Sequence, residues 1–363
     1  LNISRSLDPE KENCNFYVPV WRAEYLRDDT YKHLVALVCM DIITALPTIL
    51  LNALVIFAVA TRRRLRNNST ILLASLAGAD LLTGLVVLPF AFALDLRRLL
   101  GFDSLCSLEK AFIVTLATTT CASISHLVMI SIDRYIAIKY PLRYQEIVTE
   151  TRILISIVLA WGFTLLETIN ELVLALIDSD SVYSFYSHVN TIIQIAIGTL
   201  SIVVIFLSYG YIYSETRRQV KRLKAEQLPQ EEVQRIKNDR TAATTLAIIL
   251  IALVATYLPT IVLTALSSSI AAPPRFICVI WSWVGGTCVL GPLCNPIIYC
   301  WRMKNLRRAF LEILHLRQPE NTLPEIEVRE TERHQPRPST NHVFPLPANG
   351  QPVLLSVRHL QAD

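Results

Sequence analysis

The sequence predicts an all-α membrane protein: a seven-transmembrane helix bundle with a short cytoplasmic amphipathic eighth helix. The chain is 52% hydrophobic with a mean hydropathy of +0.42, apolar runs recur along it, and basic residues gather in alternate connections. About 20 apolar helical residues cross the ~30 Å hydrocarbon core of a bilayer. A helix also satisfies its own backbone hydrogen bonds there. A soluble chain of 363 residues is not expected to be this apolar.

Seven apolar runs are candidate spans, and the connections between them predict the orientation. Residues 61–66, 139–152 and 214–240 are basic, as is the segment after the last run, whereas the other connections mix both signs. Basic connections stay in the cytoplasm, so we expect a multi-pass plasma-membrane protein with its N-terminus outside and its C-terminus inside. The predicted spans are 33–60, 70–91, 108–138, 153–177, 188–213, 241–267 and 276–300.

Three segments flank the predicted 33–300 span region. Residues 1–32 are polar and contain one N-glycosylation acceptor, Asn2, in an Asn-Ile-Ser sequence. Residues 301–316 have one apolar and one basic face, which predicts an amphipathic helix in the inner headgroup layer of the bilayer. Residues 317–363 are rich in Pro, Glu, Arg and Asn with weak periodicity, which predicts a disordered cytoplasmic tail.

An Asp-Arg-Tyr triplet, Asp133 to Tyr135, ends the long third run. As a helix, residues 108–138 would extend about 46 Å, which is longer than the bilayer core, so the triplet is expected at the inner membrane boundary. A charged pair there is either an accident of a helix end or a functional device.

Strongly polar residues inside the spans are costly and indicate function. Asn52, Asp80, Ser123 and Asn295 each lie in a different run. If they face one another, they form a buried polar cluster that satisfies the Asp80 carboxylate with amides, hydroxyls, water or a cation. The alternative is polar packing between helices.

Two prolines interrupt predicted spans. Pro259 lies in the sixth span and Pro296 in the seventh. Each removes a backbone donor and kinks its helix. Such kinks serve either as movable elements or as static features.

In this order, one motif per expected span, the residues resemble the rhodopsin-like (class A) G-protein-coupled receptors over about residues 33–316. The resemblance implies a plasma-membrane receptor that converts binding of an extracellular ligand into activation of a heterotrimeric G protein, with arrestin as a further partner. The motifs are Asn52, Leu76 to Asp80, Asp133-Arg134-Tyr135, Trp161, Tyr257-Leu258-Pro259 and Asn295-Pro296-Ile297-Ile298-Tyr299.

The resemblance also implies a role for each switch residue. Arg134 would pair with Asp133 at rest and contact the G protein when active, and Asp239 stands where the family often places an acid that holds this arginine. Leu142 matches the apolar residue that the G protein receives. The implied coupling and activation residues are Asp133, Arg134, Tyr135, Leu142, Tyr209, Asp239, Pro259, Asn295, Pro296 and Tyr299.

A sodium ion is the one cofactor that the resemblance implies. Asp80, Ser123 and Asn295 match the family's sodium pocket, with Asn52 in the same polar core. Gly291 and Pro292 replace the usual polar pair nearby, which weakens the expectation. No His/Cys spacing predicts another metal.

The predicted outer end departs from the common family pattern. The second extracellular loop, roughly 178–187, is short and lacks Cys, Glu109 takes the usual Cys position, and the fifth span lacks its usual proline. These features resemble the group that contains melanocortin, cannabinoid, lysophospholipid and adenosine receptors. The resemblance to the melanocortin receptors implies that Cys14 pairs with Cys278, as a bridge from the N-terminus to the third extracellular loop. Pairing of Cys14 with Cys106 is the alternative, and the sequence alone does not choose between them.

The resemblance aligns Leu116 with the position on the third span that contacts the ligand. Leu116 offers no carboxylate to pair with an ammonium group, which argues against an aminergic ligand. A mostly apolar pocket favours a lipid-like ligand, whereas Asp41, Asp95, Glu109 and Glu171 near its mouth favour a basic peptide. Alternatively these acids face water or pair with neighbouring cations. The implied pocket residues are Glu109, Leu116, Thr120, Ile193, Gln194, Ile197, Tyr257, Ile261, Thr264, Gly285 and Val289.

Two other function classes are weighed against the receptor. A seven-helix transporter or channel predicts a continuous polar path and an internal repeat, and neither is apparent. A non-signalling binding receptor fits poorly with the intact Asp133-Arg134-Tyr135 triplet. No residue constellation predicts an enzyme, and the expected partners are the ligand, the G protein and the lipid bilayer, not nucleic acid.

Overall fold

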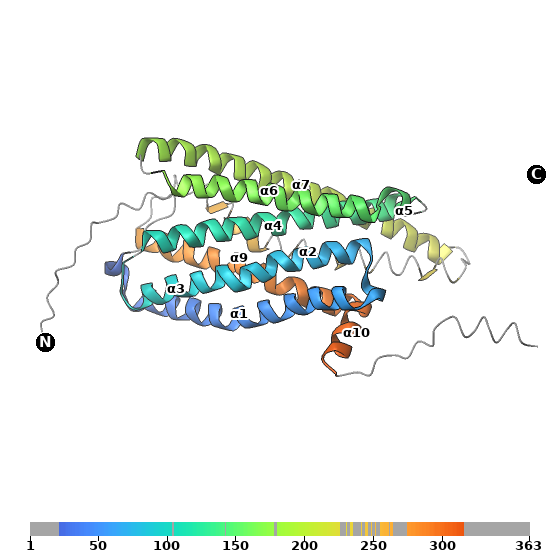
Figure 1. Cartoon of the computed structure of the whole chain (residues 1–363), viewed down its shortest axis with the longest axis horizontal. Helices are drawn as coiled ribbons and strands as arrows, with labels where there is room; N and C mark the ends of the chain where they lie inside the picture. The colour runs from blue at the N-terminus through green and yellow to red at the C-terminus, as the bar shows by residue number, and fades with distance from the viewer. Residues whose placement is uncertain are drawn as a thin grey trace, which may run out of the picture. The chain divides into compact units, whose positions relative to one another are not determined.

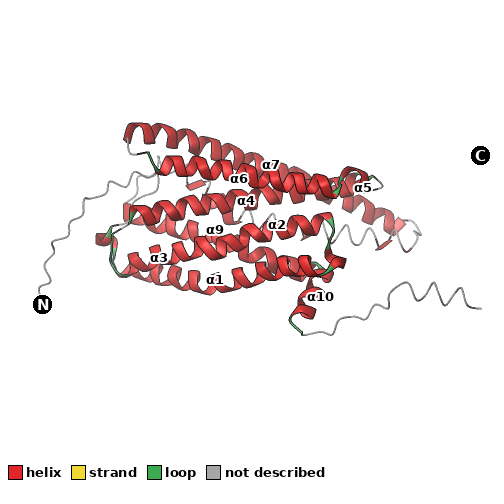
Figure 2. Cartoon of the chain, viewed as in Figure 1, coloured by secondary structure: helices red, strands yellow, loops and turns green. Residues whose placement is uncertain are grey.

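The structure, a computed structural model, describes residues 22–103, 105–141, 143–177, 180–225 and 274–315, with scattered positions between 230 and 263. The predicted glycosylation site, the tail at 317–363 and most of the predicted sixth span lie outside the described residues. What remains is a helical bundle without strands in its described parts (Figures 1 and 2).

Six helical stretches of the described chain are long and apolar enough to cross a membrane. This agrees with six of the seven predicted spans, because the predicted span 241–267 is the one that is largely not described. The stretches are α1 (Asp28–Thr61), α2 (Asn68–Leu82) continuing through η3 (Thr83–Val87) into α3 (Leu88–Leu99), α4 (Cys106–Lys139), α6 (Glu150–Ala175), α7 (Asp180–Ala225) and α9 (Pro274–Arg302).

Several helices run beyond their predicted bounds. The second span continues to Leu99, and α7 extends in both directions, from Asp180 to Ala225. The predicted loop 178–187 is therefore mostly helix. Hydropathy marks only the apolar length of a helix, and polar residues continue it where no Pro or Gly ends it. The amphipathic helix is shorter than predicted, α10 (Lys304–Ile313), because Met303 is extended and separates it from α9.

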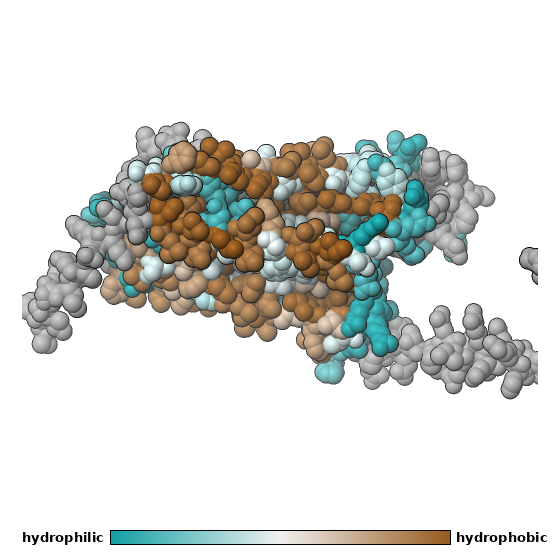
Figure 3. Space-filling model, turned by 45° about the horizontal axis from the view of Figure 1, so that its top comes forward, coloured by the Kyte–Doolittle hydropathy of each residue, from teal (hydrophilic) through white to brown (hydrophobic). Residues whose placement is uncertain are grey.

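The bundle is organised by α1 and α4. Helix α1 packs on α2, α3 and α9, and α4 packs on α2, α6 and α7. Apolar side chains on α6 and α7 remain exposed, including Val158, Leu159 and Ile192. Figure 3 shows such residues covering the visible side of the helices, with hydrophilic residues gathered toward the end that carries α5 (Tyr144–Ile147) and α10. This pattern is expected of helices that face lipid.

A π-helical turn lets α1 approach the second span closely. Within η3, a Cβ on Gly84 would lie 2.8 Å from Ile49 Cγ1 and 3.3 Å from the Ile49 backbone nitrogen. Only glycine fits this contact without a shift of α1, and π-bulges are frequent near functional sites.

Helix α10 is anchored to the bundle. Leu306, Ala309 and Phe310 are buried in the main hydrophobic cluster. The buried Glu312 carboxylate lies 2.6 Å from the Arg64 guanidinium, on the 3-10 turn η2 (Arg63–Leu65) that follows α1. The Arg64 guanidinium holds the pKa of the Glu312 carboxyl below its usual value.

Candidate functional site

The Asp-Arg-Tyr triplet forms a closed polar network at the end of α4. Arg134 Nη2 and Nε lie 2.6 and 2.9 Å from Asp133 Oδ2. The Asp133 side chain is 2% exposed and that of Arg134 is 25% exposed. A charge-assisted contact this short, with one partner buried, is a specific ion pair rather than a solvated surface pair.

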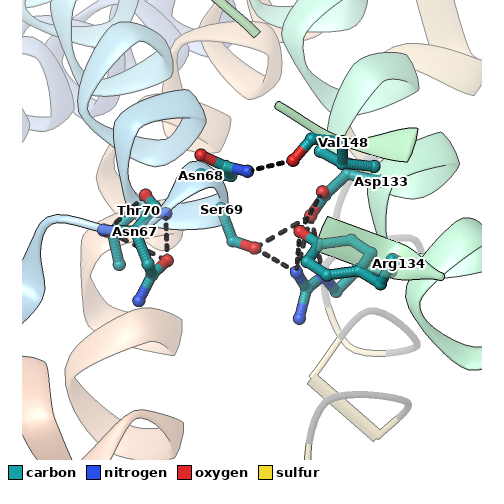
Figure 4. A network of polar contacts seen from close by, with 8 residues as sticks. Asn67, Asn68, Ser69, Thr70, Asp133, Arg134 and Val148 are labelled. Atoms are coloured by element: carbon teal, nitrogen blue, oxygen red, sulfur yellow. Dashed lines mark hydrogen bonds and ion pairs between the residues drawn. The ribbon is translucent and has the colours of Figure 1, made fainter. Parts of the chain in front are cut away.

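Two residues that the sequence analysis did not select complete this network. Ser69, in the first turn of α2, donates to Asp133 Oδ2 at 2.9 Å and accepts from Arg134, and Tyr144 donates to Asp133 Oδ1 at 2.7 Å. Burial, together with the contact to Asp133, raises the pKa of the Tyr144 phenol. Figure 4 shows Ser69 and Arg134 converging on Asp133 from different helices.

The start of α2 is fixed so that Ser69 faces α4. Asn67 caps α2 by accepting from the Thr70 amide at 3.0 Å, and Asn68 donates to the Val148 carbonyl at 2.6 Å (Figure 4). The sequence signals the cap, because Asn is a favoured N-cap residue. It carries no signal for the contacts of Ser69 and Tyr144, which depend on how α2 and α5 pack against α4.

The other predicted switch residues lie in different surroundings. Tyr135 packs on the Tyr211 ring of α7, with centroids 4.8 Å apart, and its hydroxyl accepts from Lys139 at 2.6 Å. Tyr209 is partly buried against the main cluster and Tyr299 is buried within it. Pro259 lies in the described helical stretch 255–260 and Pro296 lies in α9, whereas Leu142 and Asp239 are not among the described residues.

The polar core around Asp80 is assembled from three helices. The buried carboxylate accepts from Ser123 Oγ at 3.0 Å and from Asn295 Nδ2 at 2.9 Å. Asn52 does not join this contact; its amide donates to the carbonyls of Thr48 and Pro292. We expected Asn52, Ser123 and Asn295 all to meet Asp80. Ser123 and Asn295 do so, whereas the Asn52 amide instead binds the Pro292 carbonyl of α9.

A cavity of about 210 Å³ lies between α1, α3, α4 and α9. Its walls are mainly apolar, as predicted. Glu109, Leu116, Thr120, Gln194, Tyr257, Gly285 and Val289, all expected at the ligand pocket, line it.

A second cavity, of about 200 Å³, adjoins the first and shares Thr120, Gln194 and Tyr257 with it. Ile197 lines this second cavity, whereas Ile193 lines neither and is 46% exposed. Helix α7 therefore turns Ile193 away from the bundle. Ile261 and Thr264 lie outside the described part of the chain.

Glu171 is a buried acid in the wall of the second cavity. One of its oxygens accepts hydrogen bonds from Asn190 Nδ2, at 2.7 Å, and from Gln194 Nε2. Asn170 donates to Asn190 at 2.7 Å and extends the network. Two amide donors satisfy this carboxylate, as buried polar groups require.

The Arg98 end of the first cavity collects charges. Arg98 donates to Asp95 at 2.9 Å, to Glu109 at 2.8 Å and to Ser282 Oγ at 2.9 Å. Asp41 of α1, which is 2% exposed, lines the same cavity. Asp95 and Glu109 are therefore paired with a neighbouring cation, Arg98, as the alternative interpretation of these acids predicted. Asp41 has no such ion pair among the described residues.

The cysteines distinguish the two predicted bridges. Cys106 at the start of α4 is in a disulfide, whereas Cys278 of α9 is a buried thiol. The bridge between Cys14 and Cys278 is therefore not formed, and Cys14 itself lies outside the described residues. With Cys106 tied by a disulfide, the Glu109 end of α4 is constrained.

A multi-pass helical bundle with a buried Asp-Arg pair at one end and a cavity at the other defines a membrane receptor. Residues 51–299 match the model of the family described as 7 transmembrane receptor (rhodopsin family). The chain belongs to this family. It is therefore a G-protein-coupled receptor with a seven-transmembrane fold, and not an enzyme.

Relatives are similar along most of the chain. The histamine H2 receptor of Canis lupus familiaris is 28% identical over 326 residues, which cover 85% of this chain and 87% of that receptor. The octopamine receptor beta-1R of Drosophila melanogaster is 29% identical over 307 residues, 74% of this chain and 59% of that protein. The alpha-1A adrenergic receptor of Oryctolagus cuniculus is 27% identical over 306 residues, which cover 73% of this chain and 64% of that receptor. These three relatives are amine receptors, not members of the melanocortin and lipid receptor group.

Proposed function

We propose that this receptor takes an extracellular ligand into the cavity at the Arg98 end and transmits its binding to a G protein at the Arg134 end. Basic residues support this orientation, because 62–66, Arg143, Arg152 and the basic face of α10 belong to segments at the Arg134 end. Basic segments remain on the cytoplasmic side of a membrane. The N-terminus is then outside and the C-terminus inside, in the plasma membrane.

The observation that carries the proposal is the closed contact between Asp133 and Arg134, supported by Ser69 and Tyr144. A buried ion pair that a conformational change can open gives an element with two states, and a ligand shifts the population toward the state that it binds better. Released from Asp133, Arg134 is available to a G protein. We place Asp239 as a second resting partner of Arg134, and Leu142 as an apolar contact of the G protein and of arrestin.

Substitution of Arg134 tests the coupling role. Arg134→Gln removes the charge that the G protein would meet, and the loss of a charge-assisted contact costs about 1.5–3 kcal/mol. We expect at least about a tenfold loss of nucleotide exchange in co-expressed G proteins at equal surface expression. Arg143→Gln is the matched control, since its side chain is 73% exposed. Equal exchange by the Arg134 variant and the wild type would contradict the proposal.

The chemical class of the ligand rests on the cavity. Its apolar walls support a lipid-like ligand or the side chains of a peptide. This agrees with the finer resemblance to the melanocortin, cannabinoid, lysophospholipid and adenosine group. The histamine and octopamine receptors among the relatives favour a second candidate, an amine. Leu116 cannot pair with an amine, so such a ligand would need a carboxylate elsewhere in the cavity.

A sodium ion is proposed as a regulator at Asp80. The donor set fits a hard cation, since Asp80 and Ser123 offer oxygen ligands. Asn52 Oδ1 and the Tyr299 hydroxyl are further buried oxygens with no hydrogen-bond partner among the described residues. These residues would hold the ion, which would add a positive charge between the helices.

Asp80→Asn tests the sodium proposal. The amide keeps the shape of the side chain and one acceptor oxygen but removes its charge and the second acceptor. We expect agonist potency to fall as sodium replaces potassium in the wild type, and to be the same in both salts in the variant. Equal sodium sensitivity of the two proteins would exclude this site.

A further inference from the structure

The Arg98 end of the cavity holds more negative than positive charge. Asp41, Asp95 and Glu109 line it, and Arg98 is the single cation among its described lining residues. Arg98 binds Asp95 and Glu109 directly, at 2.9 and 2.8 Å. One arginine therefore faces three carboxyl groups and is committed to two of them.

Asp41 is the carboxyl group of the three that has no ion pair with Arg98. Its Oδ2 is buried and has no hydrogen-bond partner in the described chain, although the residue is 2% exposed and lines the cavity. An unpaired buried carboxylate costs several kcal/mol, roughly, unless a cation or a donor compensates it. Because Asp41 lines the cavity, a group bound there could supply the compensating partner.

Other charged groups near this end have other contacts. The Arg97 guanidinium lies 5.4 Å from the centre of the Phe102 ring and donates to the Asp103 carbonyl at 3.3 Å. Lys110 follows Glu109 on α4 but does not line the cavity. His33 of α1 packs edge-on against Trp283. None of these described side chains neutralises Asp41.

We propose that Asp41 is the counterion of a cationic ligand group, an ammonium or a guanidinium, that enters the cavity between α1, α3 and α9. Asp95 and Glu109 add negative potential beside it, and Arg98 holds both in place. The apolar remainder of the ligand lies along Phe112, Leu116 and Val289, which line the same cavity. This inference rests on the proposed function and gives the chemical class of its ligand.

Glu171 shows why the assignment goes to Asp41. Both are buried acids beside a cavity, but the Glu171 carboxylate accepts from the amides of Asn190 and Gln194. Buried hydrogen bonds of this kind satisfy the charge without a ligand. Asp41 has no comparable donor aimed at its Oδ2 within the described residues.

The test measures binding by thermal unfolding of the purified full-length receptor. Histamine and octopamine serve as ammonium probes, a glycine-arginine-glycine amide peptide as a guanidinium probe, and monoolein as a neutral lipid probe. We expect a cationic probe to stabilise the wild type. The probe concentration that gives the same stabilisation should be roughly ten- to a hundredfold higher for Asp41→Asn. Asp41→Glu keeps the charge and should restore most of the response. Asp28→Asn, the same change at an exposed position of α1, should behave as wild type.

Two results would overturn the proposal. One is a cationic probe that stabilises wild type and Asp41→Asn equally. The other is a panel in which no cationic probe stabilises the wild type, whether or not monoolein does. The amine and peptide probes distinguish a small ligand from a basic peptide. Arg134→Gln should bind the cationic probe normally, so failure of G-protein coupling would not be confused with failure of the Asp41 site.

Discussion

Arg98 of α3 lies beside the start of α4 and Arg134 lies near its end, and the two arginines are paired in different ways. Arg134 meets one carboxylate, Asp133, and neutral hydroxyls from Ser69 and Tyr144 complete the contact. Arg98 meets two carboxylates, with Asp41 nearby as a third acid. The Arg134 network is balanced in charge, and when its ion pair opens, the Ser69 and Tyr144 hydroxyls still donate to the Asp133 carboxylate. An unbalanced network gains stability when a cation arrives from outside. The first arrangement suits a switch, and the second suits a binding site.

The largest effect that this comparison predicts concerns the stability of the Arg98 end. Arg98→Met leaves Asp95 and Glu109 buried without their cation, and breaking a buried pair costs about 3–5 kcal/mol. We expect most of the surface expression to be lost, measured by labelling of intact cells. Arg97→Met is the control, because Arg97 packs on Phe102 and donates to the Asp103 carbonyl, and has no ion pair with an acid in the described part of the chain. Normal expression of the Arg98 variant would mean that the acids do not need this arginine.

A smaller effect is expected at the Arg134 end, where one hydroxyl contact to Asp133 can be removed while the ion pair remains. Tyr144→Phe removes the 2.7 Å contact to the Asp133 carboxylate, and a hydrogen bond to a charged group contributes about 1.5 kcal/mol or more to the resting state. Basal nucleotide exchange should rise by about tenfold. Asp239→Ala should raise it as well if Asp239 is a second resting partner of Arg134. Tyr213→Phe, at an exposed phenol of α7, is the control. An unchanged basal rate in either variant would remove that residue from the resting network.

The smallest effect lies outside both networks, where α10 meets η2. Arg64 lowers the pKa of Glu312, so this pair stabilises the fold when the pH is above the ordinary glutamate pKa and loses its contribution as the pH falls through the lowered value. Glu312→Gln should lower stability at pH 7 by about 1 kcal/mol or less. The difference from wild type should vanish in acid, measured by thermal unfolding at both pH values. Glu146→Gln, an exposed acid, should change neither. A difference that persists in acid would assign the effect to packing.

The sequence predicted best those features for which a residue type has a single physical explanation at its position. Apolar runs predicted the spans because a lipid environment requires them, whereas the pairing of Asp133 with Arg134 was implied by the resemblance to the receptor family. Asp80 with Ser123 and Asn295 was predicted by polarity alone. The helix ends were predicted less well, since polar residues extend α3 and α7 beyond their apolar parts.

The sequence by itself determined a helical membrane receptor and placed the Asp133-Arg134-Tyr135 triplet at the end of its third predicted span. The tertiary structure decided how the acids at the other end are used. Asp41, Asp95 and Glu109 come from α1, α3 and α4, and nothing in their spacing shows that one arginine serves two of them and leaves the third. The physical reason is that charge balance belongs to the space between helices. A sequence gives the charges, whereas only the packed bundle determines which of them meet.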